Sequence, residues 1–467
     1  METGERPEPL DKEAIEGQLR LMANCFGAVH GGLGTLLVYS TTLFSEQCGS
    51  TANGFFYVST WPGSMFLAVP LLSVLGRQGC LLYSFSSYVL YAILFCTARA
   101  LQTGDVEKES CLSAGPVLLC SASVVAGLAA GVMWTSQGSY FAHASALLAS
   151  GTEDPEAKTR EANAWLSGVF ALRYLGWEFA LKLLTSLIQY FKQDDASILV
   201  LIVIAALATV VFARSDPLPR EEPTSQGPAL DKFRAAISLW SDVVIWLLSP
   251  TNLAFGFGAA FMNGYFNAEV SAGIAGTASI GALAAVTVAS AALGSWCFGS
   301  YGQKHGLILP MALGSLAMLA TMYFGLSEMK GLSAAWLFLP YLLWGFGRGS
   351  YESVNRAALA DFYRGKKIDA AFANFTFQQC MASAIAFFVN RAKVSVTVTT
   401  IMALLIMPCY VLVMQRCSGE QRPVLQVGAH CVTSVERTTY QSKHGRVVRA
   451  SCASFNDFSR CKCVGAF

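Results

Sequence analysis

Long apolar runs dominate this chain and restrict what it can fold into. Runs of about 18–25 mostly apolar residues recur along the sequence, separated by short polar breaks. A helix of that length crosses a hydrocarbon core about 30 Å thick. Only 13% of the residues are charged, whereas soluble domains carry about 25%. The sequence therefore predicts an all-α, polytopic membrane protein embedded in the lipid bilayer.

We predict twelve transmembrane helices from these runs. The break at 214–245 is the longest internal one, and its Pro217, Pro219, Pro223 and Pro228 indicate a linker between two six-helix halves. The predicted spans lie near residues 21–43, 54–75, 79–99, 115–146, 162–189, 196–213, 246–268, 276–299, 306–326, 333–360, 370–390 and 395–415. The predicted organisation is a cytoplasmic N-terminal segment (1–20), an N-terminal half (21–213), a cytoplasmic linker (214–245), a C-terminal half (246–415) and a cytoplasmic tail (416–467) without helical periodicity and mostly disordered.

The placement of basic residues sets the orientation. With both termini in the cytoplasm, about 22 Lys and Arg residues fall inside, about 6 outside and about 4 within helices, as the positive-inside rule requires. We therefore expect a multi-pass protein with both termini cytoplasmic, in either the plasma membrane or an internal membrane. The net charge of +2 gives no reason to expect binding to nucleic acid.

The 14 cysteines suggest no zinc site, and the sequence calls for no cofactor or metal. Cys48 and Cys111 fall in two different outside loops. A disulfide between them is one possibility in an oxidising compartment, and the sequence does not decide it. Cys417 directly follows the last predicted span and is a candidate site for lipidation. Further cysteines of the tail include Cys452, Cys461 and Cys463.

Two pairs of segments indicate that the halves are distant repeats, as is common in transporters. LGRQGCLLYSF (residues 75–85) and YGQKHGLILPM (301–311) are both tight, basic turns flanked by glycine. QGSYFAHASALLASG (137–151) and RGSYESVNRAALADF (348–362) share the triplet GSY in the fourth and tenth spans.

Polar residues are concentrated in particular spans. The third, sixth, ninth and twelfth spans are almost purely apolar, so we expect them to face lipid. The tenth span is the most charged: Arg348, Glu352 and Arg356 recur every four residues, with Asn355 on the same helical face. Two interpretations are open, a static ladder of ion pairs between helices or a substrate site in which Glu352 couples transport to a proton.

Other spans add candidate cavity residues. Gln137 and Tyr140 in the fourth span, with Trp134 on the same broad face, either line a polar cavity or join helices. Arg173 and Glu178 lie too far around the fifth helix to pair with each other, so each requires a partner on another helix. His30 is read as a packing residue rather than a proton relay. The candidate cavity residues are Gln137, Tyr140, Arg173, Asn263, Arg348, Glu352, Asn355 and Arg356.

No enzyme motif is present, so we predict that the chain is not an enzyme. The glycosylation triplet that starts at Asn374 lies inside a predicted helix and is discounted.

These residues resemble a known family. The twelve-span pattern is similar to the major facilitator superfamily, and GVMWTSQGSYFA (131–142) resembles the fourth-helix signature of its uncoordinated-ninety-three-like branch, also called the ion channel regulatory family. The segment 69–92 resembles the same branch, and 344–363 resembles its tenth helix loosely. One departure is Ser73, where the superfamily loop commonly has an acidic residue before its Gly-Arg pair.

The resemblance implies two different functions. One is secondary transport of a small solute of unknown identity by alternating access around a central polar cavity, with proton or sodium coupling. The alternative is a non-transporting partner of another membrane protein, either a regulator of a potassium channel or a trafficking chaperone of receptors. An interaction tail at 416–467 would favour the alternative.

Overall fold

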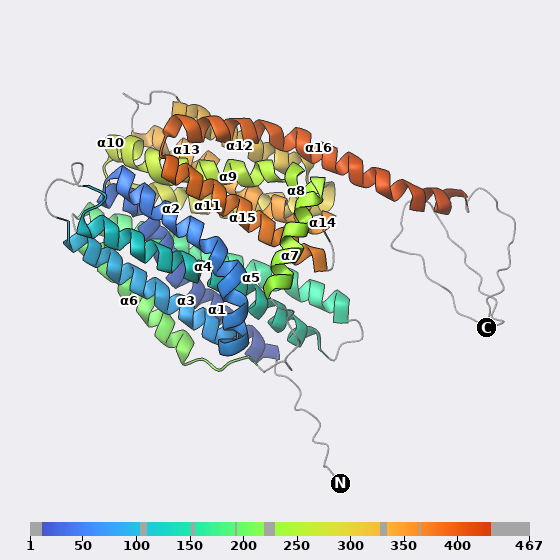
Figure 1. Ribbon diagram of the computed structural model, residues 1–467, viewed down its shortest axis with the longest axis horizontal. Coiled ribbons are helices and arrows are strands. Elements are labelled where there is room, and N and C mark those ends of the chain that lie inside the picture. Colours follow the sequence, from blue (N-terminus) through green and yellow to red (C-terminus); the bar gives the residue numbers. More distant parts are fainter. Residues whose placement is uncertain are drawn as a thin grey trace, which may run out of the picture. The chain divides into compact units, whose positions relative to one another are not determined.

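The computed structural model describes residues 12–102, 110–150, 155–191, 194–218, 229–326, 334–363 and 366–430, and these ranges contain helices and no strand (Figure 1). The chain divides into two compact units, Met1–Val413 and Met414–Phe467. The helical segments are α1 (Lys12–Leu43), α2 (Glu46–Pro62), η1 (Gly63–Leu67), α3 (Ala68–Ala100), α4 (Ala114–Ala149), α5 (Pro155–Tyr190), α6 (Asp194–Ala213), α7 (Ala229–Ser238), η3 (Leu239–Ser241), α8 (Val243–Leu247), α9 (Ser249–Phe261), η4 (Met262–Ser271), α10 (Ala272–Ala275), α11 (Ser279–His305), α12 (Ile308–Leu326), η5 (Ala334–Leu337), α13 (Phe338–Gly349), η6 (Ser350–Asn355), α14 (Arg356–Phe362), α15 (Lys366–Val389) and α16 (Ala392–His430).

Nine helices among the described residues are long and apolar enough to cross a membrane, which makes the chain a multi-pass integral membrane protein. The other predicted spans, 54–75, 162–189 and 333–360, are also helical where the structure describes them. Two of them contain the π-helices η1 and η6, and α5 carries buried charges. The count of twelve spans stays a prediction.

The helices form two packed groups within the first unit. Helices α1 to α6 contact one another, and we call them the N-terminal group; α8 to α15 form the C-terminal group, in which α11 packs on α13 and α9 on α15 (Figure 1). The groups meet mainly where α5 packs on α11 and α2 on α15.

Two glycines make the tight turns that the sequence predicts. The backbone within α3 reverses at Gly76, where φ is 70°, and the turn between α11 and α12 contains Gly306 with φ of 86°. Both angles lie in the left-handed region, where glycine avoids the steric cost of a Cβ atom. A helix–turn–helix therefore lies at equivalent places in the two groups.

Burial confirms the prediction that particular spans face lipid. Within their most apolar stretch, 28% of the residues of α6, 44% of α12 and 33% of α16 are buried, against 72% of α1 and 67% of the α8–α10 segment. The third predicted span is less clear, because half of its stretch is buried. Lipid replaces protein as the apolar environment of these helices.

The linker contains local structure that the sequence analysis did not anticipate. Asn374 of α15 donates from Nδ2 to the Ala236 carbonyl oxygen of α7 at 2.8 Å, and its Oδ1 accepts from Trp240 Nε1 at 2.7 Å. Only 2% of Asn374 is exposed, so this asparagine is a packing residue and not a glycosylation site. Residues 219–228 lie outside the described residues, and so does the tail from 431 onward.

The open question about Cys48 and Cys111 is settled by the structure: they form a disulfide with their Cα atoms 5.2 Å apart. The bond ties the start of α2 to the connection between α3 and α4. Near it, Arg99 donates to the Leu43 carbonyl oxygen at 3.0 Å. Both cysteines lie in loops that the sequence analysis predicts to be outside, where oxidising surroundings preserve a disulfide, and the orientation itself stays a prediction.

We expect the double variant Cys48→Ser/Cys111→Ser to have a lower melting temperature than the wild type in detergent. The disulfide closes a long loop in the unfolded chain, and such a bond stabilises the folded protein by about 2–4 kcal/mol. Reducing agent should lower the wild-type value to that of the variant and leave the variant unchanged. Equal melting temperatures without reductant would show that the bond does not form in the protein.

Candidate functional site

Four charged side chains form one network between the two helix groups. Glu178 of α5 accepts from Arg348 of α13 with both carboxylate oxygens, at 3.2 Å each. Lys182, one turn further along α5, donates to Glu178 Oε1 at 2.6 Å. Arg348 Nε also donates to Glu352 Oε1 at 2.7 Å. We call Lys182, Glu178, Arg348 and Glu352 the charge network.

Burial differs along the charge network. The side chain of Lys182 is 4% exposed and that of Glu178 is 8% exposed, whereas Arg348 is 15% and Glu352 is 25% exposed. Buried charges are tolerated when they are paired and hydrogen-bonded, and the two cations balance the two carboxylates. Glu352 is therefore the member with the most access to a solute or a proton.

Glycines allow neighbouring helices to pack closely around the charged part of α5. A Cβ atom on Gly31 of α1 would lie 3.1 Å from the Glu178 Cα atom. A Cβ on Gly281 of α11 would lie only 2.4 Å from the Lys182 carbonyl oxygen, which leaves no room for it. Close packing excludes lipid and water from Lys182 and Glu178, so their attraction is weakly screened.

A π-helix corrects one prediction. Arg348 and Glu352 lie on one face and pair as expected, but Arg356 does not join them. The segment η6 between them has π-helical hydrogen bonds, which place more residues in each turn and rotate the residues after it. Arg356 is exposed, and its guanidinium carbon lies 5.6 Å from the ring centre of Phe375. The regular four-residue spacing assumed for this span was wrong beyond Glu352.

Asn355 also lies away from the charge network. It is 1% exposed, and its amide donates to Asn252 Oδ1 at 2.8 Å. Asn252 in turn donates to Gln378 Oε1 at 2.7 Å. This chain of amides joins η6, α9 and α15 within the C-terminal group.

The fourth-span candidates have different surroundings. Tyr140 is 3% exposed and belongs to the hydrophobic core of the N-terminal group. Gln137 is partly exposed. Trp134 packs edge-on against Phe26 at 4.9 Å and His30 at 5.2 Å between ring centres. This helix therefore contributes both core packing and a partly exposed polar group.

His30 is surrounded by aromatic rings, which agrees with its predicted role in packing. Its ring centre lies 5.5 Å from that of Tyr174 and 5.9 Å from that of Tyr88. Its Nδ1 atom is buried and has no hydrogen-bond partner among the described residues.

Arg173 and Asn263 lie outside the charge network. Arg173 is partly exposed and donates to the Val169 carbonyl oxygen of its own helix at 3.5 Å. The backbone carbonyl of Asn263 in η4 accepts from Thr41 Oγ1 at 2.9 Å, which joins α1 to the C-terminal group. The site residue that the sequence analysis missed is Lys182, although its spacing of four from Glu178 in an apolar span was a usable signal.

The repeated GSY triplet has equivalent neighbours in the two groups. Ser139 accepts from Arg77 Nε at 3.0 Å, and Arg77 directly succeeds the Gly76 turn. Ser350 donates to the carbonyl oxygen of Pro310 at 3.4 Å, and Pro310 lies shortly after the Gly306 turn. Each serine thus contacts a residue shortly after the glycine turn between the second and third helices of its group, which supports the interpretation of the halves as repeats.

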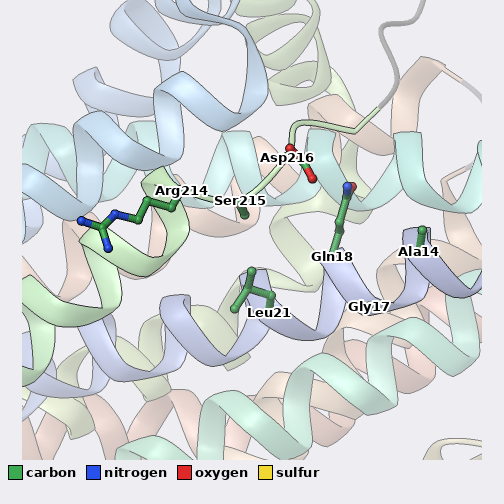
Figure 2. Close-up of a pocket in the computed structure, with 7 residues that line it drawn as sticks. All are labelled: Ala14, Gly17, Gln18, Leu21, Arg214, Ser215 and Asp216. Carbon is green, nitrogen blue, oxygen red and sulfur yellow. The ribbon is translucent and has the colours of Figure 1, made fainter.

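One pocket lies at an end of the helices, away from the charge network. Figure 2 shows its lining, with the Gln18 side chain and Asp216 directed toward the same space; its volume is about 360 Å³. Gln18 lies twelve residues before His30 on α1, about 18 Å along the helix. The residue after His30, Gly31, packs on Glu178, so the pocket is far from the charge network. The lining residues are Ala14, Gly17, Gln18, Leu21, Arg214, Ser215 and Asp216.

Comparison with known proteins identifies the fold. No protein-family model and no curated protein sequence matches this chain. Among solved structures, a point mutant of the nucleoside transporter NupG is 12% identical, with a TM-score of 0.62 over 86% of this chain and 99% of NupG. The peptide transporter POT in complex with sulfate is 12% identical, with a TM-score of 0.59 over 88% of this chain and 95% of POT. A bacterial homologue of the human drug peptide transporters PepT1 and PepT2 is 12% identical, with a TM-score of 0.58 over 88% of this chain and all (100%) of its own. The chain therefore shares the fold of these transporters, and membership of the major facilitator superfamily and of its branch stays a prediction.

The charge network predicts non-additive effects on stability. Glu178→Gln and Lys182→Met each leave a buried charge without its partner, which costs about 3–5 kcal/mol. The double variant Glu178→Gln/Lys182→Met restores neutrality and keeps the Arg348–Glu352 pair, so we expect its melting temperature to exceed that of either single variant. A double variant with the sum of the two single losses would contradict this coupling.

The close packing of α11 on α5 gives a second stability prediction. Gly281→Ala should lower the melting temperature, because its Cβ would overlap the Lys182 carbonyl oxygen. Gly273→Ala is the matched control, since nothing lies within 4 Å of the added Cβ. Equal melting temperatures for the two variants would show that α5 and α11 are not packed as described.

Proposed function

We propose that this protein is a secondary transporter that moves a small solute by alternating access between the two helix groups. The observation that carries the proposal is the charge network, which joins α5 of one group to α13 and η6 of the other within otherwise apolar helices. Charges in such a place are costly, and they commonly mark the path of a solute or proton.

The contacts between the groups support a rocking motion. Besides the charge network, hydrogen bonds among the described residues join the groups, including Thr41 to Asn263, the Gly281 amide to Tyr39 Oη, and Ser186 to the Ala278 carbonyl. They lie toward the end marked by the disulfide, beyond Lys182 on α5 and beyond His30 on α1. A closed end at the exterior and a charge network further in are what an inward-facing transporter needs.

The proposal assigns roles to the predicted site residues. Arg348 and Glu352 contact the solute or a coupling proton, and the partly exposed Gln137 contributes from α4. Protonation of Glu352 would weaken its pair with Arg348 and release that guanidinium for other contacts. Tyr140, Asn263 and Asn355 support the wall by packing, and Arg173 and Arg356 lie further from the network. Twelve spans with both termini cytoplasmic complete the proposed arrangement.

The likeness in fold supports a small solute as the cargo. The related structures are a nucleoside transporter and peptide transporters. For this chain we propose only the class, a small polar solute. The alternative function, a regulator or chaperone of another membrane protein, comes from the same family resemblance, and an interaction tail would favour it. The tail cysteines Cys417, Cys431, Cys452, Cys461 and Cys463 lie outside the residues whose side chains the structure describes.

Transport by the purified protein in liposomes tests the proposal. A panel of radiolabelled nucleosides, dipeptides, amino acids and carboxylates should include a solute that the wild type accumulates when the lumen is alkaline relative to the outside. Glu352→Gln should abolish accumulation driven by the pH gradient while leaving solute exchange at equal pH. The control Asp195→Asn, an exposed carboxylate at the start of α6, should behave as wild type.

Two results would contradict these assignments. Unchanged proton-driven accumulation by Glu352→Gln would exclude Glu352 as the coupling residue. A stable wild type that transports nothing from the panel, at any pH gradient, would count against the transporter.

A further inference from the structure

A small apolar groove lies on the outer surface of the C-terminal group. It has a volume of about 200 Å³ and is lined from the last turns of α11 and the first turns of α12. Several lining residues are exposed, with Tyr301 at 40%, Leu309 at 46% and Leu313 at 44%. Exposed apolar side chains on membrane-spanning helices face lipid, so the groove opens toward the bilayer. Its lining is Cys297, Phe298, Tyr301, Leu309, Pro310 and Leu313.

Positive charge lies at one end of this groove. Helix α11 ends in Lys304 and His305, both exposed, directly before the Gly306 turn. The His305 ring lies 4.6 Å from that of Tyr301, a residue of the groove lining. No acidic residue occurs between Tyr301 and Leu313. The groove therefore ends in a cationic site with no carboxylate of its own turn to neutralise it.

The equivalent turn in the N-terminal group is different. There, Arg77 donates to Ser139 of α4, so its cation is used within the protein. Lys304 has no hydrogen bond or ion pair with any residue that the structure describes. Since the two turns are otherwise alike, the cation of the C-terminal group is left available to something outside the chain.

We propose that this groove binds an anionic phospholipid, with the phosphate at Lys304 and His305 and the upper part of an acyl chain along Cys297 and Leu313. Lys304 is seven residues beyond Cys297, about 10 Å along the helix. The headgroup layer is about 5–8 Å thick on each side of the bilayer, so with Lys304 at the phosphates Cys297 lies at the level of the acyl chains. The basic turn lies on the side predicted to be cytoplasmic, where anionic lipids attract basic residues.

Charge complementarity and the apolar groove together select a lipid over a free anion. An exposed lysine beside an imidazole holds a small anion weakly in water, because solvent and salt screen its charge. An acyl chain adds burial of apolar surface in the groove, which only an amphipathic ligand provides.

Native mass spectrometry with matched lipids tests the proposal. The purified protein is incubated with phosphatidylglycerol or phosphatidylcholine of identical acyl chains, and bound lipid is counted as detergent is removed. The wild type should retain phosphatidylglycerol several-fold more than phosphatidylcholine. Lys304→Gln/His305→Gln should reduce that ratio to near one. The control Lys393→Gln, an exposed lysine at the start of α16, should keep the wild-type ratio.

A second variant tests the groove rather than the charge. Cys297→Phe fills it and should lower retention of both lipids; Leu313→Phe gives the same test if the first variant misfolds. A ratio that is unchanged in the Lys304/His305 variant, or reduced equally by Lys393→Gln, would overturn the proposal. Displacement of phosphatidylglycerol by inorganic phosphate would also overturn it, because the site would then be one for a free anion.

Discussion

The bidentate pair between Glu178 and Arg348 is the interaction on which the rest of this structure depends. It brings two carboxylates and two cations to one place between the helix groups, where none of them would be stable alone. Gly31 and Gly281 bring α1 and α11 close to that part of α5. The fold thus uses small residues to exclude lipid from charges that a bilayer would otherwise reject.

The helical architecture is predictable from the sequence because lipid leaves little choice. Apolar runs of membrane-crossing length must be helical, and three of the four spans predicted to face lipid, α6, α12 and α16, are the least buried of the nine. The turns at Gly76 and Gly306 were equally readable, since each glycine lies in a basic stretch between two apolar runs. Nine helices among the described residues are long and apolar enough to cross a membrane, and the other three predicted spans are helical where the structure describes them.

The candidate site was less predictable, for two physical reasons. Helical spacing identified Arg348 and Glu352, but η6 changes the number of residues in each turn and moves Arg356 toward Phe375. Sequence spacing alone does not show a π-helix. Pairing between distant helices was the second obstacle: Glu178 was known to need a partner, yet only the packing of α5 against the C-terminal group identifies it as Arg348, with Lys182 as the balancing cation.

Alternating access is the central claim, and a cross-link across the closed end tests it most directly. Thr41 Oγ1 and the Asn263 carbonyl oxygen lie 2.9 Å apart on opposite helix groups. Thr41→Cys/Asn263→Cys, joined by a short thiol-reactive cross-linker with two reactive ends, should block transport of a solute that the wild type carries, and each single variant should transport after the same treatment. Full transport by the completely cross-linked protein would contradict the account, because the two groups would not need to separate at that end.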